Sequence, residues 1–378
     1  MSDDARSMKV WPLVLPGTLA AVISLAVGQP TADWPLARAG AHYLLSGHLT
    51  VYADMPYVQM GPLSLVLAGV LPGTVYLAAV SALLPLVLWM ATVSFPPTRL
   101  TYLTTLFGGI LLAWPWAAFA VQGHGDDALV VVGIVAMAST LKSHSEVWVV
   151  SGFLIALAAK PTAILFLPLA FVHSRRAGIV ATLAGGVLWA PFVFADVPGF
   201  LAAGHGQGFI WANSLPELLG GISQTVIPGW LRLTQVIGGV AMCWFLARRS
   251  GTAAAVAGVF AFRVLTEPGT WNYYSTSVIA GAILLDLCRG WRVPWTTLLA
   301  FLSFVAVFGE PPITLARGVV RILSLTGVLA LAIATRQRAD PQPRRKATDW
   351  ARHPSRWRVT AGKDTTRSVD VVTVGPAA

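Results

Sequence analysis

Acidic side chains that can do chemistry stand at a few places between long apolar stretches. Asp33 follows the first apolar run, and Asp126 and Asp127 follow His124 at the start of a later one. A carboxylate can take a proton from a hydroxyl group, and a histidine beside two carboxylates is also a suitable ligand set for a divalent ion. The short spacing alone is weak evidence for a metal ion, so we predict no metal and no other cofactor.

Each of these acids also has a purely structural interpretation. Asp33 stands two residues before Pro35, and Asp is a preferred N-cap residue whose helices often carry proline in the first turn. Asp126 and Asp127 open an apolar segment, where the helix dipole favours negative charge. A capping role and a chemical role for Asp33 do not exclude each other. The sequence leaves both interpretations open.

Lys160 lies between two apolar runs and is followed by Pro161. An ionisable residue at such a place is costly in lipid and by default marks a functional site. The structural alternative is a side chain whose aliphatic stem reaches along the bilayer to the interface. We favour a functional role, in which the ammonium group contacts a phosphate at the membrane surface.

A cluster of polar and aromatic residues comes late in the chain: Glu267 is followed by Trp271, Asn272 and Tyr273. Aromatic rings stack on the apolar faces of a sugar, while acid and amide groups bind its hydroxyls. The alternative is an aromatic belt at the membrane interface. Arg263 precedes Glu267 by four residues, and a buried arginine needs a partner, so we predict an ion pair between them.

An amphipathic helix is predicted near residues 35–47. Arg38, His42 and Ser46 recur at four-residue spacing, while Leu36 and Tyr43 fall on the other side. This pattern is typical of a helix that lies in the membrane interface. Asp33 would then stand at the start of a polar stripe that faces water.

The composition excludes a soluble globular protein. Of 378 residues, 56% are hydrophobic and only 11% are charged, and the mean hydropathy is +0.69. A helix needs about 20 apolar residues to cross the membrane, and on this criterion the sequence contains twelve candidate segments between residues 10 and 335. We therefore predict an all-α polytopic membrane protein with about 10–12 transmembrane helices in one domain, residues 1–335.

The net charge of +10 does not indicate a nucleic-acid partner, because the cations form short clusters beside apolar runs, as in cytoplasmic loops. The basic segment 336–378 loses apolar periodicity and is predicted to be a disordered cytoplasmic tail that is attracted to anionic lipid. The segment 61–94 is predicted to be one crossing broken at Pro72-Gly73. We then expect a plasma-membrane protein with these loops outside: 29–60, 122–126, around 160, 196–230, 267–273 and 309–316.

The order of these motifs resembles the GT-C superfamily of glycosyltransferases that use polyprenyl-phosphate sugars, nearest the mannosyltransferase-like branch of actinobacteria. The matching segments are the acid after the first helix, Gly47-His48-Leu-Thr-Val-Tyr52, Met60-Gly61-Pro62-Leu63, Gly123-His124-Gly125-Asp126, Ala156-Leu-Ala-Ala-Lys160-Pro161 and Trp271-Asn272-Tyr273-Tyr274. The resemblance spans roughly residues 10–335 and rests on short motifs. It departs from the family where a proline pair is expected, at Gly61-Pro62, and in the lack of a large soluble outer domain.

The resemblance implies an inverting transfer of a sugar, expected to be mannose, from a lipid-linked phosphate donor to a glycolipid or glycan acceptor. Asp33 matches the acid that serves as general base, and Lys160 matches a lysine that meets the donor phosphate, to which we add Arg38. His124 and Asp126 match a polar loop on the acceptor side. The full set of residues expected to bind substrate is His42, His124, Asp126, Asp127, Glu267, Trp271, Asn272 and Tyr273.

The alternative is a multi-pass transporter or a flippase for lipid-linked sugars. Such proteins usually have repeated halves and polar residues near the middle of the membrane. Here the charged residues concentrate at one end and the sequence shows no repeat. We therefore rank a transferase above a transporter, and both above a purely structural scaffold.

Overall fold

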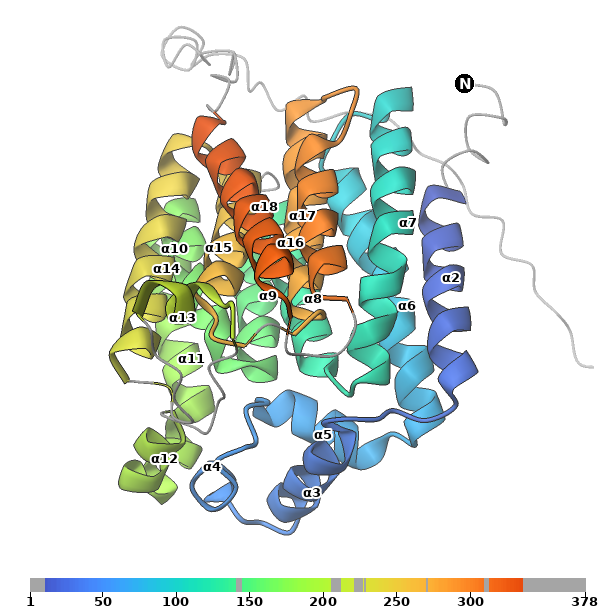
Figure 1. The fold of residues 1–378 in the computed structure, drawn as a ribbon. Coiled ribbons are helices and arrows are strands. Elements are labelled where there is room, and N and C mark those ends of the chain that lie inside the picture. The colour runs from blue at the N-terminus through green and yellow to red at the C-terminus, as the bar shows by residue number, and fades with distance from the viewer. Residues whose placement is uncertain are drawn as a thin grey trace, which may run out of the picture. The chain divides into compact units, whose positions relative to one another are not determined.

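The protein is helical throughout the part that the computed structural model describes, residues 11–140, 145–204, 212–220, 227, 229–269, 271–308 and 313–335, in which no strand occurs (Figure 1). The tail predicted over 336–378 lies outside these residues. The helices are α2 Trp11–Val27, α3 Trp34–Leu45, α4 Val51–Asp54, α5 Pro62–Val70, α6 Gly73–Val93, α7 Arg99–Val121, α8 Gly125–Thr140, α9 Glu146–Ala159, the 3-10 helix η2 Pro161–Phe166, α10 Leu167–His173, α11 Arg175–Ala195, α12 Val197–Gly204, α13 Leu215–Gly220, α14 Gly229–Arg249, α15 Thr252–Thr266, α16 Tyr274–Arg289, α17 Trp295–Ala306 and α18 Leu315–Ala334.

Five of the described helices, α6, α7, α11, α14 and α18, are long and apolar enough to cross a membrane. Shorter apolar helices run beside them in the bundle. The bundle exposes large apolar side chains: on α11, Leu183, Val187 and Phe194 are 65%, 73% and 80% exposed. A soluble protein rarely exposes so much apolar surface, whereas lipid tails accept it. These features confirm an all-helical fold in the described residues, and they are consistent with a helical membrane protein.

Two proline-containing breaks shape the end of the bundle that carries the polar residues. The predicted break in 61–94 is confirmed, because α5 ends at Val70 and α6 begins at Gly73. Helix α5 lies with α3 and α4 at that end, whereas α6 runs along the bundle (Figure 1). The second break follows α9: the backbone of Lys160 is extended (φ −158°, ψ 132°), as expected of a residue before proline.

Helices α8 and α9 are antiparallel and pack closely through small residues. A Cβ atom at Gly133 would meet the carbonyl oxygen of Gly152, and one at Gly152 would meet the carbonyl oxygen of Gly133. Small residues let helix backbones approach in this way within membranes. The start of α8, with Asp126 and Asp127, therefore lies beside the end of α9, where Lys160 leaves the helix.

The predicted amphipathic helix near 35–47 is α3. It buries Trp34, Ala37 and Ala41, while Arg38 donates through Nη1 to the carbonyl oxygen of Ala68 at 3.1 Å. Ala68 lies in the last turn of α5, where carbonyl groups lack helical partners and a cation is favoured. Arg38 thus fastens α3 to α5.

Candidate functional site

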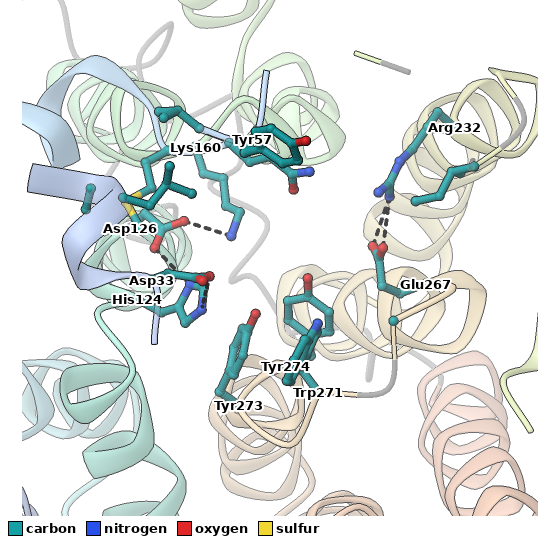
Figure 2. A pocket seen from close by; sticks show the side chains of 17 residues that line it. Asp33, Tyr57, His124, Asp126, Lys160, Arg232, Glu267, Trp271, Tyr273 and Tyr274 are labelled. Atoms are coloured by element: carbon teal, nitrogen blue, oxygen red, sulfur yellow. Dashed lines mark hydrogen bonds and ion pairs between the residues drawn. The ribbon is translucent and has the colours of Figure 1, made fainter. Parts of the chain in front are cut away.

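One cavity of about 240 Å³ is lined by α3, the segment 57–60, the turn before α8 with the start of that helix, Lys160, the start of α14, and the segment between α15 and α16. Figure 2 shows its charged groups on two sides and its aromatic rings between them. Seven of the residues predicted from the sequence line it: Asp33, His124, Asp126, Lys160, Glu267, Trp271 and Tyr273. Asp127 does not line the cavity but contacts Lys160, which does. Arg38, His42 and Asn272 do not line this cavity.

Lys160 is engaged by two buried carboxylates. Its Nζ lies 2.7 Å from Oδ2 of Asp126 and 2.7 Å from Oδ2 of Asp127, and all three side chains are almost fully buried. Arg263 adds a second cation, with Nη1 3.6 Å from Oδ1 of Asp127. Two cations therefore neutralise two acids, which is the condition under which buried charges are tolerated.

Asp33 stands at the N-cap of α3, but its side chain does not bond the helix backbone. Instead Oδ2 of Asp33 accepts a hydrogen bond from Nε2 of His124 at 3.0 Å, and the imidazole ring stacks on Tyr273 at 3.9 Å. Nδ1 of His124 faces Oδ1 of Asp126 at 3.5 Å. The Asp33 side chain is 48% exposed. One oxygen of the Asp33 carboxylate is thus fixed by His124, while the side chain remains open to the cavity.

A glycine-rich turn holds His124 in this position. Gly123 has φ +84°, in the left-handed region that favours glycine, and a Cβ there would lie 2.7 Å from the backbone nitrogen of Trp34. The backbone N–H of Asp33 donates to the carbonyl oxygen of Gln122 at 3.2 Å. The turn and the start of α3 therefore pack closely against each other.

Both members of the Asp33–His124 pair are charged near neutral pH. The hydrogen bond from His124 holds the pKa of Asp33 below its ordinary value of 3.8, against the effect of partial burial. Burial alone would lower the pKa of His124, but the nearby carboxylates of Asp126 and Asp33 raise it from 6.5 to about 9. His124 is therefore an imidazolium with two acidic neighbours.

This pair makes the stability of the protein depend on pH in a defined window. Because the folded pKa of His124 is raised, its contribution is fully present below about pH 6.5 and is lost as the pH rises through about 9. The pKa of Asp33 is lowered, so Asp33 stays ionised across this window and does not change the dependence of stability on pH there. We expect the melting temperature of the wild type in detergent to fall across it more steeply than that of His124→Gln. Parallel curves for the two proteins would contradict this charge state.

On the other side of the cavity, Glu267 pairs with Arg232 of α14. Nη1 of Arg232 lies 3.0 Å and 3.1 Å from the two carboxylate oxygens and 2.8 Å from Oε1 of Gln235. The predicted ion pair between Arg263 and Glu267 is wrong. Glu267 follows the end of α15 with an extended backbone (φ −71°, ψ 125°), so it has left the helical register of Arg263, which faces Asp127 instead.

Arg232 was missed by the sequence interpretation. It lies at the start of the apolar run 231–247, on the side predicted to face outward. Arginine is less common there than on the cytoplasmic side, and this departure is the signal that could have identified it.

Aromatic rings connect the two charged sides. Trp271 and Tyr273 are stacked at 6.2 Å, and Tyr273 meets the edge of Tyr274 at 4.7 Å. Asn272 accepts from Gln122 at 3.4 Å and so ties this segment to the turn that carries His124. Of these rings, Tyr273 is buried, whereas Trp271 is 39% exposed and lines the cavity, so it can offer a flat apolar surface there.

The side chains of His124, Asp126 and Asp127 offer ligand atoms within 4.8 Å of one another, close enough to hold a metal ion. The Lys160 ammonium already supplies positive charge to both carboxylates. The absence of a metal cofactor stays a prediction.

Comparison with known proteins adds no assignment to this geometry. No family model, no curated protein and no solved structure matches this chain.

Proposed function

We propose that this chain is a membrane glycosyltransferase with a GT-C-like bundle of about 10–12 transmembrane helices. It moves a sugar, expected to be mannose, from a polyprenyl-phosphate donor to a hydroxyl of a lipid or glycan acceptor on the outer face of the plasma membrane. The observation that carries the proposal is Asp33: an ionised, half-exposed carboxylate, fixed by His124 at a cavity with an aromatic wall. A pre-positioned base beside a surface for sugar stacking fits this chemistry.

In the proposed reaction the acceptor hydroxyl donates to the Asp33 oxygen that His124 does not occupy. Asp33 takes the proton as the acceptor oxygen bonds to the anomeric carbon from the face opposite the phosphate. The bond from that carbon to the phosphate oxygen breaks, and the electron pair leaves on the lipid phosphate. The leaving phosphate gains negative charge and needs a cation or hydrogen-bond donors in the cavity.

The low pKa of Asp33 affects this step in two ways. It keeps the carboxylate charged at neutral pH, and it weakens the carboxylate as a base. Proton transfer to Asp33 is therefore best coupled to formation of the bond to the sugar, when the acceptor oxygen loses its electron density. His124 acts as a positioning residue, because it holds one oxygen of Asp33 and leaves the other to face the acceptor.

The proposed orientation places the Asp33 end of the bundle outside the cell. In a Cys288→Ser background, we expect Thr31→Cys to react with a membrane-impermeant maleimide on intact cells, because Thr31 is exposed near Asp33. Val293→Cys, exposed in the segment between α16 and α17 beside Arg289 and Arg292, should react only after the cells are opened. Labelling of position 293 on intact cells would reverse the orientation.

The experiment that tests the function uses membranes from a host that lacks such an activity, with and without this protein. The membranes receive polyprenyl-phosphate mannose with a radiolabelled sugar and a glycolipid extract as acceptor. We expect a labelled product that depends on the protein. Movement of intact donor between the two leaflets, with no labelled product, would favour the flippase alternative instead.

A further inference from the structure

Three cations could be considered for an anionic ligand of the cavity, and two of them, Lys160 and Arg38, are poorly placed to bind it. Lys160 contacts an oxygen of each of two carboxylates, both at 2.7 Å, and its side chain is only 7% exposed. A phosphate placed there would also meet the two acids and be repelled by them. Arg38 bonds backbone carbonyl oxygens of α5 and lies outside the cavity.

Arg232 is in a different state. It lines the cavity, and its side chain is 27% exposed. Its hydrogen bonds to described residues all leave from Nη1, toward Gln235 and Glu267. The guanidinium group has five N–H donors, so the N–H groups on Nε and Nη2 are open to a further acceptor from the part of the cavity that the structure describes.

The geometry of the cavity separates Arg232 from the base. Figure 2 shows Arg232 and Glu267 on one side and Asp33 with His124 on the other, with Trp271 between them. Ile227 also lines the cavity and forms a small apolar cluster with Leu231, next to Arg232 in α14. A guanidinium group beside apolar side chains suits an anion that is attached to a hydrocarbon chain.

We propose that Arg232 binds the phosphate of a prenyl-phosphate ligand, and that Lys160 is an internal counterion of Asp126 and Asp127. This assignment rests on the proposed function in taking the ligand to be the donor. A planar guanidinium fork matches two phosphate oxygens at once, which a lysine ammonium does not. The sugar would then lie over the aromatic rings, with its anomeric carbon between Arg232 and Asp33.

Glu267 is expected to set the affinity of Arg232 for phosphate. Its carboxylate is buried and holds Arg232 through a single nitrogen, so it neutralises the guanidinium group before the ligand arrives. A phosphate and Glu267 therefore compete for one cation. Removal of the Glu267 charge should strengthen phosphate binding, which is the opposite of what a purely structural ion pair would give.

The test measures direct binding of farnesyl phosphate to the purified protein in detergent by calorimetry, so it requires no transfer activity. We expect Arg232→Gln to weaken binding about 10- to 100-fold, as for the loss of charge-assisted hydrogen bonds. Arg232→Lys should fall between wild type and Arg232→Gln. The matched control is Arg176→Gln, which removes an arginine whose side chain is 84% exposed and does not line the cavity.

Two further arms identify the ligand and separate a folding defect from a lost contact. Farnesol tests the prenyl chain alone and inorganic phosphate tests the anion alone, and we expect both to bind more weakly than farnesyl phosphate. Glu267→Gln should bind farnesyl phosphate more tightly than wild type, and the double variant Arg232→Gln/Glu267→Gln should lose that gain. All variants are first checked for native helix content and a single gel-filtration peak.

Equal binding of farnesyl phosphate by wild type and Arg232→Gln would overturn the assignment, and so would weaker binding by a folded Glu267→Gln protein. If inorganic phosphate bound as tightly as farnesyl phosphate, the ligand assigned to Arg232 would be free phosphate and not a lipid phosphate. If farnesyl phosphate binding depends on Arg232 but no sugar is transferred, the result would count against the proposed function. The assignment of Arg232 as the phosphate-binding residue would then still hold.

Discussion

Replacement of Asp33 by Asn is expected to lower sugar transfer by ~10²–10⁴-fold and to leave the protein folded. Asn has the same shape and can still accept the hydrogen bond from His124, but it cannot take a proton from the acceptor. The side chain of Asp33 makes no capping bond to α3, so loss of its charge removes no support from that helix. The measurement is initial transfer rate with saturating lipid donor and purified protein.

The control for this variant is donor binding. Asp33 lies on the opposite side of the cavity from Arg232, so Asp33→Asn should bind farnesyl phosphate with near-normal affinity. Near-normal turnover by the Asn variant would remove Asp33 from the mechanism. The base would then have to be another acid of the cavity, Asp126 or Glu267.

Replacement of Lys160 by Met is expected to cost about 3–5 kcal/mol of stability, because it leaves buried carboxylates without their main partner. Arg263 is 3.6 Å from Asp127 and cannot replace the ammonium group at 2.7 Å from both acids. The measurement is the free energy of unfolding in mild detergent. Lys160→Arg keeps the charge but not the geometry, and should lie between Met and wild type.

A double-variant cycle shows whether this cost belongs to the ion pairs. Asp126→Asn removes one of the two acids, so Lys160→Met should cost less in the Asp126→Asn background than in the wild type. Equal costs in the two backgrounds, or a Lys160→Met protein as stable as the wild type, would mean that Lys160 reaches solvent as the snorkelling interpretation requires.

The fold could be predicted where a local rule decides the backbone. Proline and glycine mark the break between α5 and α6, and Pro161 forces Lys160 out of α9. Four-residue spacing of polar side chains identified α3. Each of these signals acts within one or two turns of chain, so one sequence is enough to read it.

The pairing of charges could not be predicted in the same way, because partners lie far apart along the chain. Asp33 meets His124 across 91 residues, a contact set by the turn at Gly123 and the start of α3. Four-residue spacing predicts Arg263 and Glu267 as partners only where the helix continues, and α15 ends at Thr266. Arg232 was missed because a single charge at the end of an apolar run resembles a helix boundary.

The central claim is that Asp33 is the base for transfer of a sugar from a lipid phosphate, and purified protein in liposomes tests it most directly. Liposomes receive polyprenyl-phosphate mannose and a glycolipid extract, and the measurement is release of sugar-free polyprenyl phosphate together with mannose in a new lipid product. We predict that both appear in equal amounts, require the acceptor extract and are lost in Asp33→Asn. Donor that stays intact in the presence of wild-type protein and acceptor, or equal release by wild type and Asp33→Asn, would contradict the account.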